Sequence, residues 1–89
     1  MGRWKGCDNA NFTGMCQDFR DSLIECHDLP VELKDRMTSV AVVSGQYCWF
    51  FEGNKCLGTK LEVKPPGTLN LRGRRFDNAI RSWKCWKQE

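Results

Sequence analysis

The chain has 89 residues, of which 40% are hydrophobic, and a formal net charge of +3. A chain of this length forms one small domain and buries only about 60–65% of the surface of its unfolded state, so its core needs reinforcement. No apolar run is long enough for a transmembrane helix. These features exclude a second large domain within these residues and a membrane-spanning helix.

Short β-rich runs, separated by Gly, Pro, Asn and Asp, follow one another along the chain. One segment, "LPVELKDRM", indicates a short helical turn that Pro30 opens and that ends near Asp35. The strand-type runs after it are "TSVAVVSG", "QYCWFFEG", "TKLEVKPPG", "TLNLRG" and "IRSWKCW". Short strands with turn signals at a spacing of about ten residues predict an all-β sandwich or barrel.

The sequence also repeats itself. The segment "KDRMTSVAV", residues 34–42, aligns with "DNAIRSWKC", residues 77–85. Each copy reads as a strand, a tight glycine hairpin, two strands, a loop and a closing strand, which is the composition of a Greek key. We therefore predict a single domain over residues 1–89, with one Greek key at about 4–43 and a second at about 46–87, packed as a two-sheet sandwich.

The chain contains six cysteines. No C-x-x-C pair occurs, and His27 is the only histidine, so the spacing does not indicate a zinc site. An even number of cysteines in a small chain instead predicts three disulfides formed in an oxidising compartment, and therefore a secreted, extracellular protein. Each disulfide can stabilise the fold by about 2–4 kcal/mol. The sequence leaves the pairing open among Cys7, Cys16, Cys26, Cys48, Cys56 and Cys85.

Two hairpins carry one pattern in which Cys and Phe are exchanged. The positions concerned are Cys7, Phe12 and Gly14 in the first hairpin and Phe51, Cys56 and Gly58 in the second. The pattern aromatic-x4-aromatic-x-Gly, followed in each copy by an Asn/Asp-rich loop that ends in Ser, resembles the Greek-key motif of the βγ-crystallin family. The resemblance covers about Trp4 to Trp86. It implies one βγ-crystallin domain, most similar to small secreted fungal members with six cysteines.

The exchange of Phe and Cys predicts a change in how the hairpins are held. In the family, the two aromatic residues of a hairpin pack on each other, and the glycine adopts the positive φ of the turn. Each hairpin here keeps one aromatic residue and has a cysteine in the other place. The resemblance therefore implies that a disulfide replaces the aromatic stack, as suits a small secreted core.

Members of the βγ-crystallin family often bind calcium through a loop of the form Asn/Asp-Asn/Asp-x-x-Ser/Thr-Ser. In the first matching loop Lys34 replaces an acidic residue, and in the second Arg81 replaces a hydroxyl residue. Each loop has lost an oxygen ligand and gained a cation that repels Ca²⁺. We expect weak or absent calcium binding, no other cofactor, and serines that fix turns. The remaining candidate ligands are Asp35, Thr38, Ser39, Asp77, Asn78 and Ser82.

The basic residues gather toward the C-terminus. Residues 60–89 carry eight basic and three acidic side chains, whereas residues 1–59 carry six basic and eight acidic ones. Basic residues interleaved with Trp can bind an anionic surface. The alternative is that Trp83 and Trp86 belong partly to the core and that the charges only meet solvent. The predicted partner-binding residues are Arg72, Arg74, Arg75, Arg81, Trp83, Lys84, Trp86 and Lys87.

Other local motifs indicate little chemistry. His27 lies near Glu25 and Asp28 in sequence, but no nucleophile motif or phosphate-binding loop is present, so we expect no enzyme. The alternation of a strand puts His27 and Glu25 on one face, as a weakly coupled surface pair. "NFT", starting at Asn11, fits an N-glycosylation sequon, with an ordinary turn residue as the alternative.

The resemblance suggests a non-enzymatic binding protein that acts as a fungal effector or as a toxin-like, antimicrobial antagonist. The expected partner of this monomer is a macromolecule, either an anionic membrane or glycan surface or a host protein, and nucleic acid is not expected. One alternative is a calcium-stabilised structural or stress module. Another is a protease inhibitor, whose loop would be "EVKPPGT", residues 62–68, because its two prolines restrict the backbone. An ordinary strand connection is the simpler interpretation of that loop.

Overall fold

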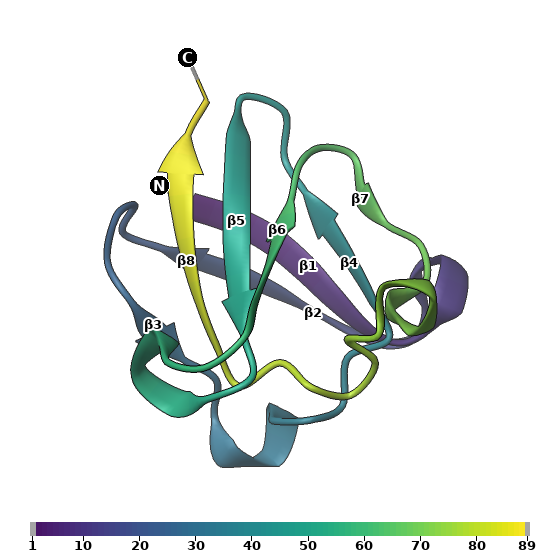
Figure 1. The fold of residues 1–89 in the computed structure, drawn as a ribbon. Coiled ribbons are helices and arrows are strands. Elements are labelled where there is room, and N and C mark those ends of the chain that lie inside the picture. The colour runs from purple at the N-terminus through teal and green to yellow at the C-terminus, as the bar shows by residue number, and fades with distance from the viewer. Residues whose placement is uncertain (1, 89) are drawn as a thin grey trace.

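Two four-stranded antiparallel sheets pack face to face in the computed structural model, which describes residues 2–88 (Figure 1). The first sheet has the order β2-β1-β4-β7, with β1 at Gly2–Asn9, β2 at Thr13–Asp21, β4 at Ser39–Val42 and β7 at Gly67–Thr68. The second has the order β3-β8-β5-β6, with β3 at His27–Asp28, β5 at Gln46–Phe51, β6 at Lys60–Val63 and β8 at Ser82–Lys87. The predicted all-β sandwich of two Greek keys is confirmed.

Four short 3₁₀ turns connect the strands: η1 at Ala10–Phe12, η2 at Val31–Leu33, η3 at Asn54–Cys56 and η4 at Leu71–Arg74. Each half of the chain also places one strand in the sheet of the other half. β3 pairs with β8, and β7 pairs with β4. Within residues 2–88 no helix has the length and apolar character needed to cross a bilayer.

The core between the sheets is built around Trp4, which is 2% exposed. Its ring stacks on Phe19 at 4.3 Å and meets Phe50 and Trp83 edge-on at 4.7 and 5.3 Å. These four side chains come from four different strands, so their contacts join the two sheets. Trp83 is only 4% exposed, which confirms the alternative that this residue belongs to the core. It offers no surface to a partner.

The six cysteines form three disulfides, as predicted: Cys7–Cys16, Cys26–Cys56 and Cys48–Cys85. The first joins directly opposed residues of β1 and β2, and the third joins directly opposed residues of β5 and β8. The second ties the loop before β3 to η3. Three disulfides in so small a domain indicate an oxidising, extracellular environment.

The two hairpins that exchange Phe and Cys have the same backbone conformation. Phe12 and Cys56, the equivalent residues, both have φ of 57°. Gly14 and Gly58 follow at φ of 80° and 85°, in the left-handed region where glycine carries no steric penalty. The repeat detected in the sequence is therefore a repeat of backbone geometry.

A buried serine holds each hairpin over its sheet. Ser39 Oγ accepts a hydrogen bond from the Phe12 N–H at 3.1 Å and donates one to the Asn9 carbonyl at 2.7 Å. Ser82 Oγ makes the equivalent bonds with the Cys56 N–H at 2.9 Å and the Gly53 carbonyl at 2.6 Å. Both serines are 0% exposed. The prediction that they fix turns is confirmed.

The segment "TLNLRG" differs from its predicted strand. Only Gly67–Thr68 pairs in the sheet, opposite β4. Asn70 ends the strand because its side chain accepts a hydrogen bond from the Arg72 N–H at 3.0 Å and caps η4. Leu71 then turns into the core and is 0% exposed.

Candidate functional site

Three aromatic side chains lie together on the outer surface of the second sheet. Tyr47 and Trp49 belong to β5, and Trp86 belongs to the neighbouring β8. The Tyr47 and Trp86 rings are stacked, with centroids 5.5 Å apart and planes 9° apart. The Trp49 ring lies 4.2 Å from Trp86 at 53°. All three side chains are partly exposed, so their rings form a continuous apolar strip next to solvent.

Lysines surround this strip. Lys60 Nζ lies 3.4 Å from the centroid of the Trp49 ring, and Lys84 Nζ lies 5.3 Å from that of Trp86, within the range of cation–π contacts. Among the described residues, no carboxylate forms an ion pair with either of these two lysines. We call this surface the aromatic–lysine face. It consists of Tyr47, Trp49, Lys60, Lys84 and Trp86, and the exposed Glu62 of β6 lies directly opposite Trp49.

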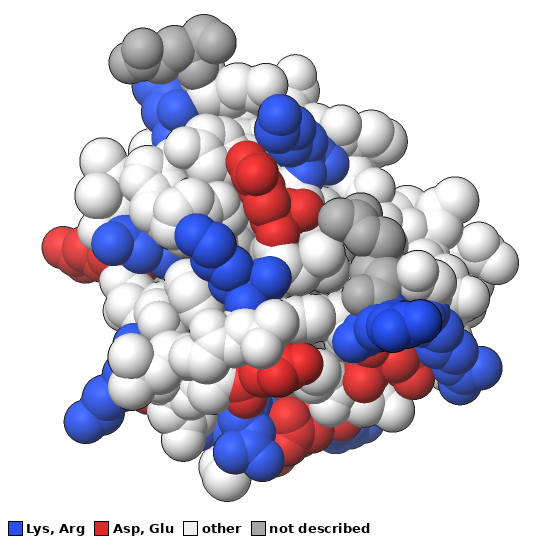
Figure 2. Space-filling model, in the orientation of Figure 1, with Lys and Arg blue, Asp and Glu red and all other residues white. Residues whose placement is uncertain are grey.

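Charges on this side of the molecule are dispersed. β8, β5 and β6 lie in front of the other sheet in Figure 1, and Figure 2 shows the same side, with basic side chains separated by uncharged and acidic ones. The C-terminal basic cluster predicted from sequence is therefore divided. Lys84 and Trp86 belong to the face, whereas Lys87 points to the opposite side of β8. Arg72, on η4, pairs with Asp77 at 3.2 Å.

Two further predicted partner-binding arginines, Arg75 and Arg81, lie outside this face. Arg81 is paired with Asp35, as described below. Arg75 is exposed at the end of η4. The side chain of Arg74 lies outside the described part of the structure. Arg75 and Arg81 add to the positive field of the molecule without joining the aromatic strip.

Three residues of the face were missed by the sequence analysis: Tyr47, Trp49 and Lys60. The alternation of "QYCWFF" contains part of the signal, because it puts Tyr47 and Trp49 on the side opposite to the buried Cys48 and Phe50. The pairing of β5 with both β8 and β6, which brings Lys84 and Lys60 next to Trp49, is a tertiary feature. Local sequence does not specify it.

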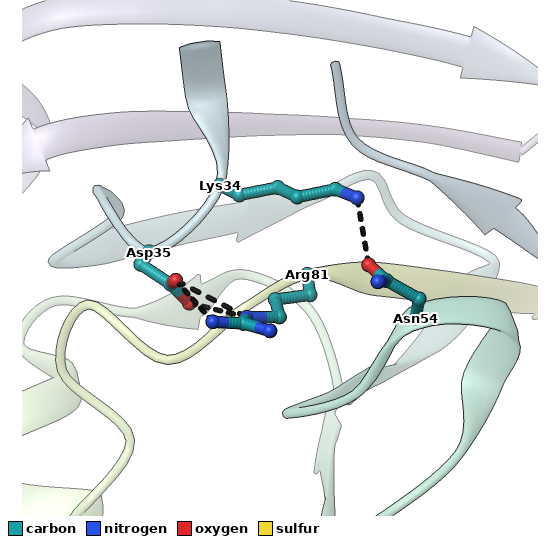
Figure 3. A network of polar contacts seen from close by, with 4 residues as sticks. All are labelled: Lys34, Asp35, Asn54 and Arg81. Carbon is teal, nitrogen blue, oxygen red and sulfur yellow. Dashed lines mark hydrogen bonds and ion pairs between the residues drawn. The ribbon is translucent and has the colours of Figure 1, made fainter. Parts of the chain in front are cut away.

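In the first calcium-type loop, the Asp35 carboxylate is paired with the guanidinium group of Arg81 (Figure 3). Arg81 Nε donates to both carboxylate oxygens of Asp35 at 3.1 Å, and Nη2 donates to Oδ2 at 3.0 Å. These hydrogen bonds, with the charge of Asp35, raise the pKa of Arg81 above its ordinary value. Lys34 Nζ points instead to Asn54 Oδ1, at 2.7 Å. The Asp35 carboxylate therefore already neutralises one cation.

The second loop also lacks a ligand set for calcium. Asp77 Oδ2 accepts a hydrogen bond from Arg72 Nε at 3.2 Å. The other carboxylate oxygen of Asp77, Oδ1, is buried and has no hydrogen-bond partner. In the first loop, the candidate ligand Thr38 is buried, at 5% exposure. Residues 2–88 contain no group of three or more His, Cys, Asp or Glu side chains placed to hold a metal ion. Calcium requires six to eight oxygen ligands, so a site in either loop would rely mainly on hydroxyl, amide and carbonyl oxygens beside the cations Arg72 and Arg81.

We expect calcium to leave the protein unchanged. Titration of the oxidised, metal-stripped protein with Ca²⁺ in a calorimeter is expected to give only heats of dilution, and Tm is expected to be the same with and without the ion. In the variant Arg81→Thr, the Asp35 carboxylate loses its guanidinium partner, so calcium is expected to raise Tm more than in the wild type. Saturable heat with the wild type would contradict this interpretation of the loops.

His27 has a different partner from the one expected. Its Nδ1 lies 4.0 Å from Asp21 Oδ1, and its Nε2 is hydrogen-bonded to the Ser22 carbonyl at 3.0 Å. The ring also lies 5.4 Å from that of Trp83. The expected pair with Glu25 does not form because the short β3 begins only at His27, so Glu25 does not share its strand alternation.

The remaining two local motifs lie in structured connections. In the segment 62–68, the Pro66 carbonyl accepts a hydrogen bond from the Val42 N–H at 3.1 Å, and β7 follows directly. The segment is thus tied to the edge of β4, as the simpler interpretation expects. Asn11 is exposed, with φ of 60°, and its N–H donates to the Leu69 carbonyl at 2.8 Å. Its glycosylation stays a prediction.

Comparison with known proteins identifies the fold. No protein-family model and no curated protein matches the sequence. A structure from work on the evolution of the eye lens βγ-crystallin domain fold superposes with a TM-score of 0.85 at 20% identity, over 99% of this chain and 88% of that one. The βγ-crystallin domain of Clostridium beijerinckii gives 0.78 at 20% identity, over 94% and 97%. An archaeal βγ-crystallin gives 0.75 at 21% identity, over 93% and 95%.

The chain therefore has the βγ-crystallin fold, as the motif resemblance implied. More specifically, it is a single-domain, six-cysteine form of that fold, in which three disulfides supplement a small core. A clostrillin double mutant of the same fold was solved in complex with nickel, so such domains can bind metal. Identities near 20% establish the fold alone. The function must be argued from the residues of this chain.

Proposed function

We propose that this protein is a secreted, non-enzymatic binding protein that acts as a fungal effector or toxin-like antagonist through its aromatic–lysine face. The observation that carries the proposal is the placement of three aromatic rings and two lysines on one solvent-facing sheet surface. A sheet face that meets only water commonly carries polar side chains. Aromatic residues that stay partly exposed beside unpaired cations are typical of interaction surfaces.

The chemistry of the face favours an anionic glycan as its partner. The rings of Trp49 and Trp86 are flat apolar surfaces against which a sugar ring can pack. The Nζ groups of Lys60 and Lys84 stand beside those rings, where a sulfate or carboxylate can accept charge-assisted hydrogen bonds. A glycan that carries sulfate or carboxylate groups can contact a ring and the adjacent ammonium group at the same time, so we propose a glycan rather than a membrane as the partner.

Heparin-affinity chromatography tests the proposal. The variant Lys60→Gln/Lys84→Gln removes the two cations beside the rings and is expected to bind heparin about tenfold more weakly at fixed salt, because each lysine contributes roughly 0.5–1 kcal/mol at a solvent-exposed site. The matched control is Lys55→Gln/Arg75→Gln, which removes the same charge from exposed positions on η3 and at the end of η4. It is expected to bind nearly as well as the wild type.

Two results would contradict the proposal. Equal weakening in both double variants would show that net charge, rather than the face, determines binding. Wild-type binding to phosphatidylglycerol vesicles that exceeds binding to heparin, and that Lys60→Gln/Lys84→Gln abolishes, would assign the face to a membrane instead.

A further inference from the structure

The opposite sheet carries a second surface that the proposed function does not use. A groove of about 410 Å³ hollows the outer face of β2, β1 and β4. Three of its exposed lining residues are cationic, one is a carboxylate, and three are apolar. They are Arg3, Lys5, Arg20, Asp18, Phe12, Ala41 and Val43. They alternate along the strands with the buried Trp4, Phe19 and Val42, so the groove lies on the solvent side of the core.

The strand register sets two like charges side by side in this groove. Arg3 of β1 is directly opposite Arg20 of β2. Like charges in directly opposed positions destabilise a sheet. Among the described residues, no carboxylate forms an ion pair with either guanidinium. Asp18 lies opposite Lys5, in the next row along the strands. An anion between the two guanidinium groups would relieve their repulsion and accept several charge-assisted hydrogen bonds.

The other side of the groove is apolar and held in place. Lys5 is opposite Ala41 of β4, and Val43, which is 39% exposed, follows β4. Phe12 closes the groove from the hairpin. Its backbone is fixed by the hydrogen bond from its N–H to Ser39 Oγ. The apolar lining is thus contributed by β4, the residue that follows it and a hairpin whose backbone is hydrogen-bonded to β4.

We propose that this groove binds a small organic anion with an apolar body. The sulfonate, sulfate, phosphate or carboxylate of the ligand lies between Arg3 and Arg20, and its apolar body packs against Phe12, Ala41 and Val43. The volume falls within the range of about 300–1,000 Å³ that is typical of small-molecule sites. The groove and the aromatic–lysine face lie on different sheets, so a ligand in one leaves the other accessible.

Fluorescence titration with 8-anilinonaphthalene-1-sulfonate tests the proposal, because this probe combines one sulfonate with an apolar aromatic body. The variant Arg3→Gln/Arg20→Gln is expected to raise its Kd at least tenfold. The same variant is expected to leave the Kd of the uncharged analogue N-phenyl-1-naphthylamine within about twofold, since the apolar wall is unchanged. The control Lys55→Gln/Arg75→Gln, which removes equal charge elsewhere, is expected to keep the wild-type Kd for both probes.

Amide chemical shifts locate the bound sulfonate and complete the test. In the wild type, the largest shifts on addition of the probe are expected in β1, β2 and β4. An unchanged Kd in Arg3→Gln/Arg20→Gln would overturn the proposal. So would the largest shifts on β5 and β8, because the probe would then bind the aromatic–lysine face. A single variant, Arg20→Gln, measures the repulsion between the two arginines in the absence of a ligand. It is expected to raise Tm slightly, and a marked fall in Tm would contradict a repulsive arginine pair.

Discussion

Replacing Cys48 and Cys85 together by alanine is expected to lower the free energy of unfolding by about 4–5 kcal/mol. The disulfide closes a loop with a sequence separation of 37, and the entropy of such a loop corresponds to about 4 kcal/mol. Both cysteines also lie in the core, at 0% and 2% exposure, so removal of the sulfur atoms leaves space that the neighbours fill only in part. Small domains have a total stability of about 5–15 kcal/mol, so much of it would be lost.

Urea unfolding followed by tryptophan fluorescence measures this loss. The matched variant is Cys26→Ala/Cys56→Ala, because its disulfide closes a loop of similar separation, 30, while Cys26 is exposed. The loop-entropy contribution is nearly equal for the two pairs, so any excess loss in Cys48→Ala/Cys85→Ala measures core packing. If the core variant proves as stable as the wild type, the assignment of this pair as a core staple is wrong.

The disulfide pairing shows why part of this fold could not be predicted. Each hairpin was expected to exchange an aromatic stack for a covalent bond, and Cys7 indeed bonds across its hairpin to Cys16. Cys56 instead reaches the distant Cys26. Cys48 and Cys85 meet only because β5 and β8 pair in a register that opposes them. The register of strands far apart in sequence depends on tertiary packing, which short-range patterns do not specify.

The candidate binding surface also depends on the pairing of strands that are far apart in sequence. Lys84 and Trp86 were predicted because basic residues are interleaved with Trp near the C-terminus, and they share a face because they alternate along β8, whereas Lys87 points to the opposite face. Their neighbours Trp49 and Lys60 lie on two other strands and join them only through sheet pairing. Conversely, Arg81 was predicted as a contact for a partner, but the fold places it against Asp35, where it neutralises a carboxylate of its own chain. The prediction made from the basic composition of the C-terminal third therefore assigned more cations to one surface than the fold places there.

Replacing Ser39 and Ser82 together by alanine is expected to lower the free energy of unfolding by about 3–5 kcal/mol. Each hydroxyl accepts a hydrogen bond from one backbone N–H and donates to one carbonyl of its hairpin. The double substitution removes these four hydrogen bonds, and each contributes about 1 kcal/mol net to stability. The control Ser44→Ala makes the same chemical change at an exposed turn residue and is expected to be nearly neutral.

The same pair of variants separates two roles for the loops that end in these serines. If the hydroxyls hold the hairpins, urea unfolding is shifted to lower denaturant equally with calcium and with a chelator, and the amides of Phe12 and Cys56 exchange faster with solvent. A loss of stability that appears only in the presence of calcium would instead make the serines part of a metal site. The first result is expected, because both Oγ atoms already use a donor and an acceptor within the protein and Arg81 already neutralises the Asp35 carboxylate.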